Sequence, residues 1–481
     1  MADISISSYG VYIPSNRMER SAIAEAHRWA VPSLKGLAKG QKAFCNWDED
    51  SITMAVEAAR GCLKGATGSV GSVVFASTTP VYSDLQNASI VANAVGLDKV
   101  STLDATGSLR SGISSLINAF ERAAASDTLV LASDNRLGQP ASTQEMEYGS
   151  GAVALTVSKA GGIANYLGSE SEAVAFVDHF RAPDKPFDYF WEARWIRDEG
   201  YVKIVPPVVT RLLDKVGVAA ADIKHFVINA TTGGAEAAVA RKLGIAKEAI
   251  VGNLFAQCGD TGAAHPLIML ASALEKAAPG DLILVVGFGA GCDAVLLRAT
   301  EQVSQYKAAA SVASALAAGR SDTHYMRLLS FTGQIDLDWG MRSEGDQKTA
   351  LTESYRSNDM LSPFVGGKCQ DCGQIQFPIM PMCVNCSSTK PVDQVPLADA
   401  PAKIMTCTED WLQYYPAPPL CFGLVQFDNG ARVMMEFANI TKEQLVVGMP
   451  LRMVFRIKER DDKRGYSRYF WKATPNTAAQ G

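Results

Sequence analysis

The sequence has no long apolar run and no excess of basic residues. Its longest apolar run, DLILVVGFGAG at residues 281–291, is far shorter than the roughly 20 residues that a membrane-spanning helix needs. Lysine and arginine number 45 against 50 aspartate and glutamate residues, which gives a formal net charge of -5. A nucleic-acid-binding surface normally shows as a clustered basic excess. We therefore expect neither a membrane-embedded protein nor a nucleic-acid partner.

The start of the chain also lacks the features of a secretion signal. The segment MADISISSYGVYIP has no basic start and no apolar core, and it predicts a strand that ends at a proline turn. A nucleotide-binding glycine signature is missing too, because GFGAGCDA at 287–294 follows a late strand and continues into another. A cytoplasmic protein is expected.

Residues 1–300 have the pattern of a layered α/β fold. Short runs rich in valine, isoleucine and leucine alternate with alanine-rich helical patterns, and 481 residues are too many for one simple core. The predicted strands lie at 72–77, 128–133, 152–158, 225–230 and 282–288, and the predicted helices at 50–64, 86–95, 111–125, 204–217, 234–243 and 263–277.

Each half of this region carries a strand, a turn rich in glycine and small residues, and a helix. We call DATGSLRSG at 104–112 the first elbow and QCGDTGAAHP at 257–266 the second elbow. Many acyl-transfer enzymes present a nucleophile at such a helix N-terminus, where backbone N–H groups favour negative charge. The first elbow, however, contains no cysteine.

The C-terminal part of the chain has a different character. Residues 301–361 predict a polar connector with an alanine-rich helix, and from about residue 400 alternating strands predict a small β-barrel. Between them lies GGKCQDCGQIQFPIMPMCVNC, with two C-x-x-C pairs that can direct four thiolates to one tetrahedral Zn²⁺. Unliganded buried thiols or a redox pair are the alternatives. Four thiolates leave no open coordination position, so the zinc is predicted to be structural, bound by Cys369, Cys372, Cys383 and Cys386.

Three segments are informative together: GVYIPSNR at 10–17, DEDSITMAVEAARGCL at 48–63, and the strand, elbow and helix at 101–124. They resemble 3-hydroxy-3-methylglutaryl-CoA synthases, particularly their archaeal and bacterial forms, within the thiolase superfamily. The resemblance covers roughly residues 1–355. Residues 362–475 are similar to the zinc-ribbon and OB-fold domain that accompanies thiolases and such synthases.

The resemblance implies a thiolase-like fold of five αβαβα layers built from two similar halves, each with a five-stranded mixed sheet. It also implies a homodimer and an acyl-CoA substrate, with coenzyme A as substrate or product. The predicted domains are the N-terminal half at 1–160, the C-terminal half at 161–300, the connector at 301–361, the zinc ribbon at 362–390 and the OB-fold at 391–475.

The residues expected at the catalytic positions do not all follow the family. The resemblance places the nucleophilic cysteine position at Leu109, with Ser108 just before it, and the synthase glutamate near Thr78. The catalytic histidine of the family aligns with Asn229. The asparagine that helps to bind the thioester oxygen in condensing relatives aligns with Asp260.

Because leucine offers neither a lone pair nor an ionisable proton, the usual acyl-enzyme route is closed at residue 109. The favoured function is cysteine-independent retro-aldol or retro-Claisen cleavage of a 3-hydroxyacyl or 3-oxoacyl substrate. Asp260 would act as the base, with Asn229 or the turn at 106–110 donating hydrogen bonds to the enolate. His265 and Tyr82 are further acid/base candidates. Asp260 as a helix N-cap and His265 as a structural histidine are the plainer interpretations.

Two other functions remain open. The first is a condensing acyltransferase whose nucleophile is Ser108 or a displaced Cys258. The second is a catalytically silent acyl-CoA-binding scaffold for a separate thiolase, since several family residues are replaced at once.

Two further segments are candidates for substrate contact. Tyr189, Trp191 and Trp195 lie in the aromatic segment 187–201, which predicts either a wall over the acyl group or a dimer contact. Gly289 and Gly291 follow a late strand, where glycine allows the backbone to approach a substrate.

Overall fold

The computed structural model describes residues 4–66, 68–123, 126–159, 161–341 and 350–476. The described residues form two compact units. The first holds the chain up to Thr332 except for residues 47–49 and 93–98, which belong with the residues from Gly333 onward in the second. The predicted connector is therefore divided between the units, because its helix α11 (Val312–Ala317) packs against the core of the first. None of the helices among the described residues has the length and apolar character of a membrane span.

The strands of the first unit form one hydrogen-bonded path, β11-β12-β13-β8-β1-β7-β6-β4-β5. Only two residue pairs join β8 to β1, so the path consists of two sheets that meet at a short contact. The first sheet contains β1 (Ser5–Tyr12), β4 (Val70–Ala76), β5 (Ser101–Ala105), β6 (Asp127–Asn135) and β7 (Ser150–Ser158). The second contains β8 (Ala164–Ala173), β11 (Ile223–Ile228), β12 (Leu282–Phe288) and β13 (Gly291–Ala299).

The second sheet has four strands where the resemblance implies five. In the first sheet, β5 pairs in parallel with β4 and leads into the first elbow. At the corresponding place in the second half a single parallel bridge joins Ile250 to Phe226 of β11, and the chain then leads into the second elbow. The fifth strand is thus reduced to one bridge, and the repeat between the halves is retained.

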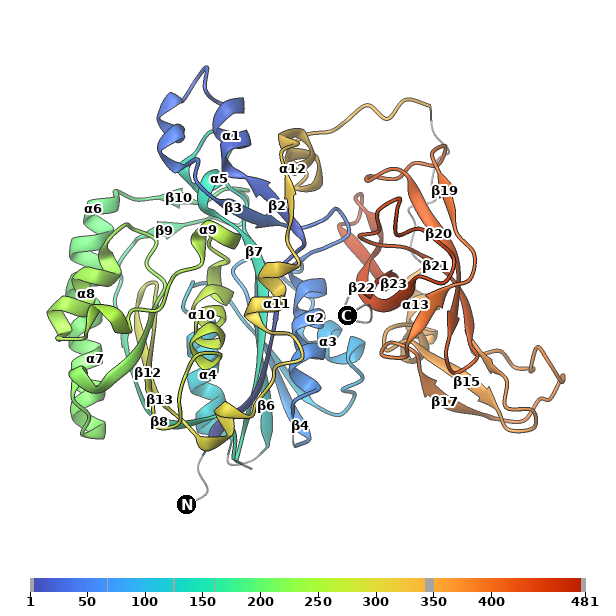
Figure 1. Cartoon of the computed structure of the whole chain (residues 1–481), viewed down its shortest axis with the longest axis horizontal. Coiled ribbons are helices and arrows are strands. Elements are labelled where there is room, and N and C mark those ends of the chain that lie inside the picture. Colours follow the sequence, from blue (N-terminus) through green and yellow to red (C-terminus); the bar gives the residue numbers. More distant parts are fainter. Residues whose placement is uncertain (1–3, 67, 124–125, 160, 342–349, 477–481) are drawn as a thin grey trace. The chain divides into compact units, whose positions relative to one another are not determined.

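Helices cover both sheets and fill the space between them, which gives five αβαβα layers (Figure 1). Helices α4 (Ser111–Arg122) and α10 (His265–Leu274) contact each other and strands of both sheets, and they share one apolar core cluster. Helix α2 (Ser51–Leu63) covers the first sheet, and α7 (Val202–Val216) and α8 (Ala235–Leu243) cover the second. The two central helices start at the elbows, so the fold places both elbows in the central layer.

The second unit contains a three-stranded sheet and a six-stranded antiparallel sheet. The small sheet is formed by β15 (Val365–Cys369), β16 (Ile375–Gln376) and β17 (Val392–Pro396). The larger sheet is closed by a bridge from Phe437 to Ala473, as expected of the predicted barrel. Its strands are β18 (Ala402–Ile404), β19 (Thr408–Asp410), β20 (Leu420–Phe427), β21 (Arg432–Glu436), β22 (Pro450–Asp461) and β23 (Tyr466–Pro475).

Candidate functional site

The first elbow carries no reactive side chain at its mouth. Leu109 is a buried hydrocarbon, only 6% exposed. The Ser108 hydroxyl donates to the Gly289 carbonyl at 2.9 Å and accepts from the Arg110 amide at 3.3 Å. A Cβ atom at Gly289 would lie 2.7 Å from the Ser108 oxygen, so glycine is required for this close approach. In this structure Gly289 therefore accommodates the elbow itself.

The four cysteines of the first unit, Cys45, Cys62, Cys258 and Cys292, are all buried. Burial raises the pKa of Cys62 to about 11 and that of Cys258 to about 12. The Cys258 thiol points to the carbonyls of Leu254 and Gly259. The thiolate is the nucleophilic form of cysteine, and a raised pKa disfavours it. Burial and raised pKa values are therefore typical of cysteines that pack in a core.

The second elbow holds a charged side chain in the position that the first leaves apolar. Asp260 is 3% exposed and follows α9 (Phe255–Cys258). One of its oxygens accepts from the Asn229 amide and from the Gly262 N–H, both at 3.1 Å, and the other pairs with Arg136 at 3.1 Å. The contact with Gly262 is local, but Asp260 is not an N-cap, because Thr261 precedes the 3-10 turn at Gly262–Ala264 and Ala264 precedes α10. The other two contacts go to side chains of distant elements.

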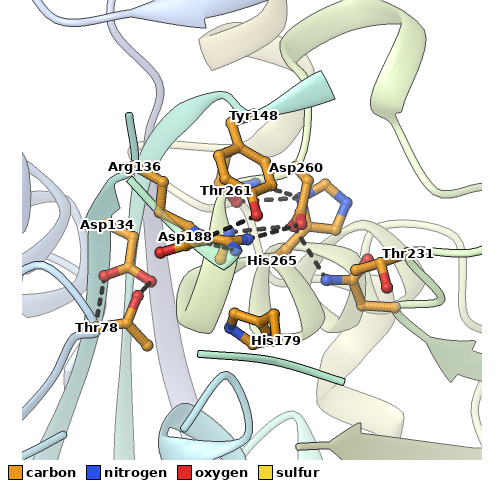
Figure 2. Close-up of polar contacts among 12 residues, drawn as sticks. Thr78, Asp134, Arg136, Tyr148, His179, Asp188, Thr231, Asp260, Thr261 and His265 are labelled. Atoms are coloured by element: carbon orange, nitrogen blue, oxygen red, sulfur yellow. Dashed lines mark hydrogen bonds and ion pairs between the residues drawn. The ribbon is translucent and has the colours of Figure 1, made fainter. Parts of the chain in front are cut away.

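Arg136 connects two carboxylates at the centre of the site (Figure 2). It follows β6 and lies 2.7 Å from Asp188 as well as 3.1 Å from Asp260, with its guanidinium 3.6 Å from the centre of the Tyr148 ring. Burial alone would raise the pKa of Asp188, but Arg136 and then Arg181 lower it overall. Arg136 thus favours the anionic form of Asp188 and forms an ion pair with Asp260 as well.

Asn229 presents an acceptor without a partner. It follows β11, is largely buried, and donates through its amide nitrogen to Asp260. Its amide oxygen has no hydrogen-bond partner among the residues that the structure describes. An unsatisfied buried acceptor costs free energy unless another molecule supplies a donor. This atom is the clearest sign of a ligand position in the first unit.

A second carboxylate, Asp134, ties the two halves together. It lies at the end of β6 and accepts from Ser77, Thr78 and Thr79, which follow β4, and from the Ala263 N–H of the second elbow at 2.7 Å. Because Asp134 already accepts hydrogen bonds from all of these donors, its role is structural. The Thr78 hydroxyl, near which the resemblance places the synthase glutamate, lies 2.9 Å from the Asp134 carboxylate.

His265 has no nitrogen left for a substrate. Its Nδ1 contacts the amide and hydroxyl of Thr261, both at 3.1 Å, and its Nε2 lies 2.6 Å from the Asn253 carbonyl. The side chain is completely buried, and burial lowers its pKa. These contacts favour the structural interpretation of His265. For Tyr82, the two contacts with Asn87 that the structure shows involve its backbone.

The aromatic candidates Tyr189, Trp191 and Trp195 are 55%, 47% and 48% exposed. Tyr189 contacts Phe180 and Trp191 through ring centroids 5.4 and 6.2 Å apart. Tyr189 and Trp191 therefore belong to one surface cluster, whereas Trp195 stacks on Phe176 with ring centroids 6.3 Å apart. Asp188, which precedes these residues, pairs with Arg136 in the site.

Four residues at this site were not identified from the sequence: Asp134, Arg136, Asp188 and His179. Arg136 and Asp134 lie directly at the end of a predicted strand, where functional side chains of α/β folds collect, and this position could have indicated them. His179 and Asp188 lie on strands of two residues, β9 (His179–Phe180) and β10 (Tyr189–Phe190), which leave no periodic pattern. An adjacent Asp-His pair, Asp178 and His179, was the only local signal.

The four cysteines of the second unit form a metal site. Their sulfur atoms all lie within 4.8 Å of one another, which suits tetrahedral zinc. The Gln374 N–H and the Asn385 side chain lower the pKa of Cys372 to about 6. The Ser388 N–H lowers the pKa of Cys386, but the hydrogen bond between the Cys386 and Cys372 side chains raises it overall to about 12. A bound cation would stabilise the thiolate form of sulfurs that lie this close together.

Two family models match the chain. Residues 213–299 match the C-terminal domain of 3-oxoacyl-[acyl-carrier-protein] synthase III, and residues 364–392 match the rubredoxin-like zinc ribbon domain of ChsH2. The second match agrees with the cysteine geometry, so the predicted zinc ribbon is confirmed.

Relatives and solved structures agree with the fold. The hydroxymethylglutaryl-CoA synthase of Aeropyrum pernix is 30% identical over 313 residues, which cover 63% of this chain and 86% of that protein. The 3-oxoacyl-(acyl carrier protein) synthase III of Pseudomonas aeruginosa superposes with a TM-score of 0.56 at 22% identity, covering 62% of this chain and 98% of the synthase. MvaS in complex with 3-hydroxy-3-methylglutaryl coenzyme A gives 0.59 at 19% identity, covering 68% and 91%.

Proposed function

The chain belongs to the hydroxymethylglutaryl-CoA synthase family, and from this premise we propose that it cleaves a carbon–carbon bond of an acyl-CoA without a covalent intermediate. The favoured reaction is retro-aldol cleavage of a 3-hydroxyacyl thioester. Retro-Claisen cleavage of a 3-oxoacyl thioester is the related alternative, in which water or free coenzyme A attacks the 3-oxo carbon and Asp260 takes the proton of that nucleophile.

The observation that supports this proposal is the contrast between the two elbows. The position of the family nucleophile is a hydrocarbon at Leu109, and the Ser108 hydroxyl is already hydrogen-bonded. The second elbow instead carries Asp260, next to an amide oxygen of Asn229 that lacks a partner in the described chain. A site of this kind can move protons and stabilise charge, but it cannot form an acyl thioester.

Asp260 is the proposed base. In its ion pair with Arg136 it is a carboxylate, the form that accepts a proton from a substrate hydroxyl. The Asn229 oxygen would accept a hydrogen bond that orients this hydroxyl or an amide of the pantetheine arm. Backbone N–H groups of the turn at 106–110, at the start of α4, would stabilise the enolate on the thioester oxygen.

The test is a panel of 3-hydroxyacyl-CoA and 3-oxoacyl-CoA esters with aliphatic and aromatic chains, together with the free acids. Products are identified by liquid chromatography and mass spectrometry. We expect cleavage of at least one ester, and a loss of about 10²–10⁴-fold in kcat/KM for Asp260→Asn. Asp322→Asn is the matched control, because Asp322 is also buried and paired with an arginine, at 2.8 Å.

Two outcomes would contradict the proposal. Condensation of two acyl groups through an acylated Ser108 or Cys258 would identify a condensing acyltransferase. Tight binding of acyl-CoA with no turnover of any ester, and no effect of Asp260→Asn, would identify a scaffold.

We also propose that the protein is a homodimer, as the family resemblance implies. Light scattering after size-exclusion chromatography should give twice the chain mass of 51.4 kDa. A monomer mass at all concentrations would contradict this.

A further inference from the structure

The hairpin at 178–191 brings several charged side chains into the site. Its strands pair through only two residue pairs, Tyr189 with Phe180 and Phe190 with His179. Arg181 donates to the backbone carbonyl of Thr78 and to Asp188 at 2.8 Å, and Asp188 pairs with Arg136. The hairpin is thus fixed to the residues that follow β4 and β6 of the first sheet by partly buried polar contacts.

At the start of this hairpin, Asp178 and His179 form a carboxylate–imidazole pair. The carboxylate of Asp178, which is largely buried, lies 2.9 Å from His179 Nδ1, and the His179 side chain is 14% exposed. Nε2 of His179 has no hydrogen-bond partner among the described residues. A carboxylate on Nδ1 fixes the ring and its tautomer and leaves Nε2 to exchange a proton.

His179 lies beside the polar centre. Its charge contributes, after burial and the two arginines, to the pKa of Asp188, the carboxylate that Arg136 joins to Asp260. Phe190, the strand partner of His179, follows Asp188 by two residues, and Asp188 lies 2.7 Å from Arg136. Figure 2 draws His179 in the same close-up as Asp188, Arg136 and Asp260.

The other four histidines differ from His179. His27 contacts Glu145 and Tyr325 through Nε2, and His225 contacts Asp281 through Nε2. Both nitrogens of His265 are bound within the chain, and His324 is largely exposed on the surface. Among the described residues, His179 alone combines a buried carboxylate on Nδ1, an unpartnered Nε2 and a place at the polar centre.

We infer that His179, held by Asp178, is the acid that returns a proton to the α-carbon of the product, an inference that rests on the proposed cleavage. Asp260 takes the proton of the substrate 3-hydroxyl, and the electron pair of the O–H bond becomes the second carbon–oxygen bond. The bond between the α- and β-carbons breaks, and its electron pair passes to the α-carbon and the thioester oxygen as an enolate.

His179 Nε2–H then donates its proton to the α-carbon. The products are a carbonyl compound and a shortened acyl thioester, with no oxidant or further reactant. Asp260 ends with one proton more and His179 with one fewer, and exchange with solvent restores both. The Asp260 carboxylate thus removes one proton from the substrate, and the His179 imidazole delivers one proton to the product.

The reverse of the second step can be measured without cleavage. Acetyl-CoA and propionyl-CoA are incubated with the full chain in deuterium oxide, and deuterium in the α position is measured by mass spectrometry. The wild-type protein should exchange the α-hydrogens of at least one of the two esters.

His179→Gln should lower the exchange rate by about 100-fold or more, and Asp178→Asn should lower it less. Added imidazole should restore exchange in His179→Ala, which a purely structural role would not allow. His225→Gln is the matched control, because His225 is also partly buried and lies 3.1 Å from an aspartate oxygen. Its exchange rate should equal that of the wild type.

Wild-type exchange in His179→Gln, or no exchange by the wild-type protein with either ester, would overturn the inference. A different result would show that only the proposed function fails. In that case exchange would depend on His179, but no 3-hydroxyacyl or 3-oxoacyl ester would be cleaved.

Discussion

The two elbows occupy corresponding places in the two halves but differ in the chemistry they present. The first elbow follows a regular strand, β5, and carries the buried hydrocarbon side chain of Leu109 and the Ser108 hydroxyl, which is already hydrogen-bonded. The second follows a single bridge residue, Ile250, and leads to Asp260 in a network of charges. A repeat therefore conserves the position of a helix N-terminus while its two copies carry different side chains. In this chain the proposed base, Asp260, lies on the second copy.

Metal removal is expected to have the largest effect, and it should leave both elbows chemically intact because none of their residues is a zinc ligand. Chelation should unfold the segment around Cys369–Cys386, because binding free energies of about 10–16 kcal/mol are folding free energies in such sites. Limited proteolysis with and without chelator should show new cleavage within this segment. Protection that is unchanged after proven zinc loss would contradict the metal assignment.

A matched pair of glycine substitutions compares the elbows directly. Gly262 has a φ of +62°, and an added Cβ would lie 2.2 Å from an Asp134 oxygen, whereas Gly107 has a φ of +88° with open space around it. Gly262→Ala should therefore destabilise the first unit by about 3–5 kcal/mol, and Gly107→Ala by only about 1–2 kcal/mol. Denaturant unfolding measures both. Equal losses would show that the second elbow is no more tightly packed than the first.

The protonation of Glu147 gives a pH-dependent test near the second elbow. Its carbonyl accepts from the Asp260 N–H, and burial raises the pKa of its carboxyl to about 7. Between pH 4.5 and 7 the folded chain binds more protons than the unfolded chain, so this group lowers stability as the pH rises. Glu147→Gln should remove a penalty of about 1–3 kcal/mol at pH 8 and little at pH 4.5.

Thermal unfolding of both proteins at the two pH values measures the difference. A benefit that is the same at both pH values would show that Glu147 ionises as an exposed carboxyl does.

The smallest effect is expected from Ser108→Ala at the first elbow. The substitution removes one hydrogen bond to the Gly289 carbonyl and should cost about 1 kcal/mol of stability. Cleavage should change by less than about threefold, since the hydroxyl takes no part in proton transfer. A loss of cleavage as large as that of Asp260→Asn, in a folded protein, would give the first elbow a chemical role.

Much of the fold follows from local patterns in the sequence. The predicted strands at 72–77, 128–133, 152–158 and 282–288 correspond to β4, β6, β7 and β12. Helices α2, α4, α8 and α10 lie within the predicted helical segments, and α7 begins two residues before its predicted segment, 204–217. For α4, the last two predicted residues, 124 and 125, lie outside the described residues. These elements carry long periodic apolar patterns, which local sequence encodes well.

The site was harder to predict because its contacts join elements far apart in the chain. The alignment with the family brought Asn229 and Asp260 together, and the structure shows them 3.1 Å apart. The strand-end position of Arg136 could have indicated this residue, but its two ion pairs could not be inferred. Its partners Asp260 and Asp188 are separated from it by 124 and 52 positions in the sequence. The aromatic pattern predicted substrate contacts at Tyr189, Trp191 and Trp195. The residues of the hairpin at 178–191 that contact the site are instead charged. Alternation on two-residue strands gives too short a pattern to assign the buried face.

The most direct test of the account is the intact mass of the wild-type protein after mixing with acyl-CoA esters and rapid acid quenching, followed by peptide mapping of the first unit. Leu109→Cys serves as a control for access, because it places a thiol at the mouth of α4. We predict an unmodified wild-type mass under conditions in which the ester is cleaved. An acyl group on Ser108, Cys258 or any other side chain of the first unit, formed and lost at the rate of turnover, would contradict catalysis without a covalent intermediate.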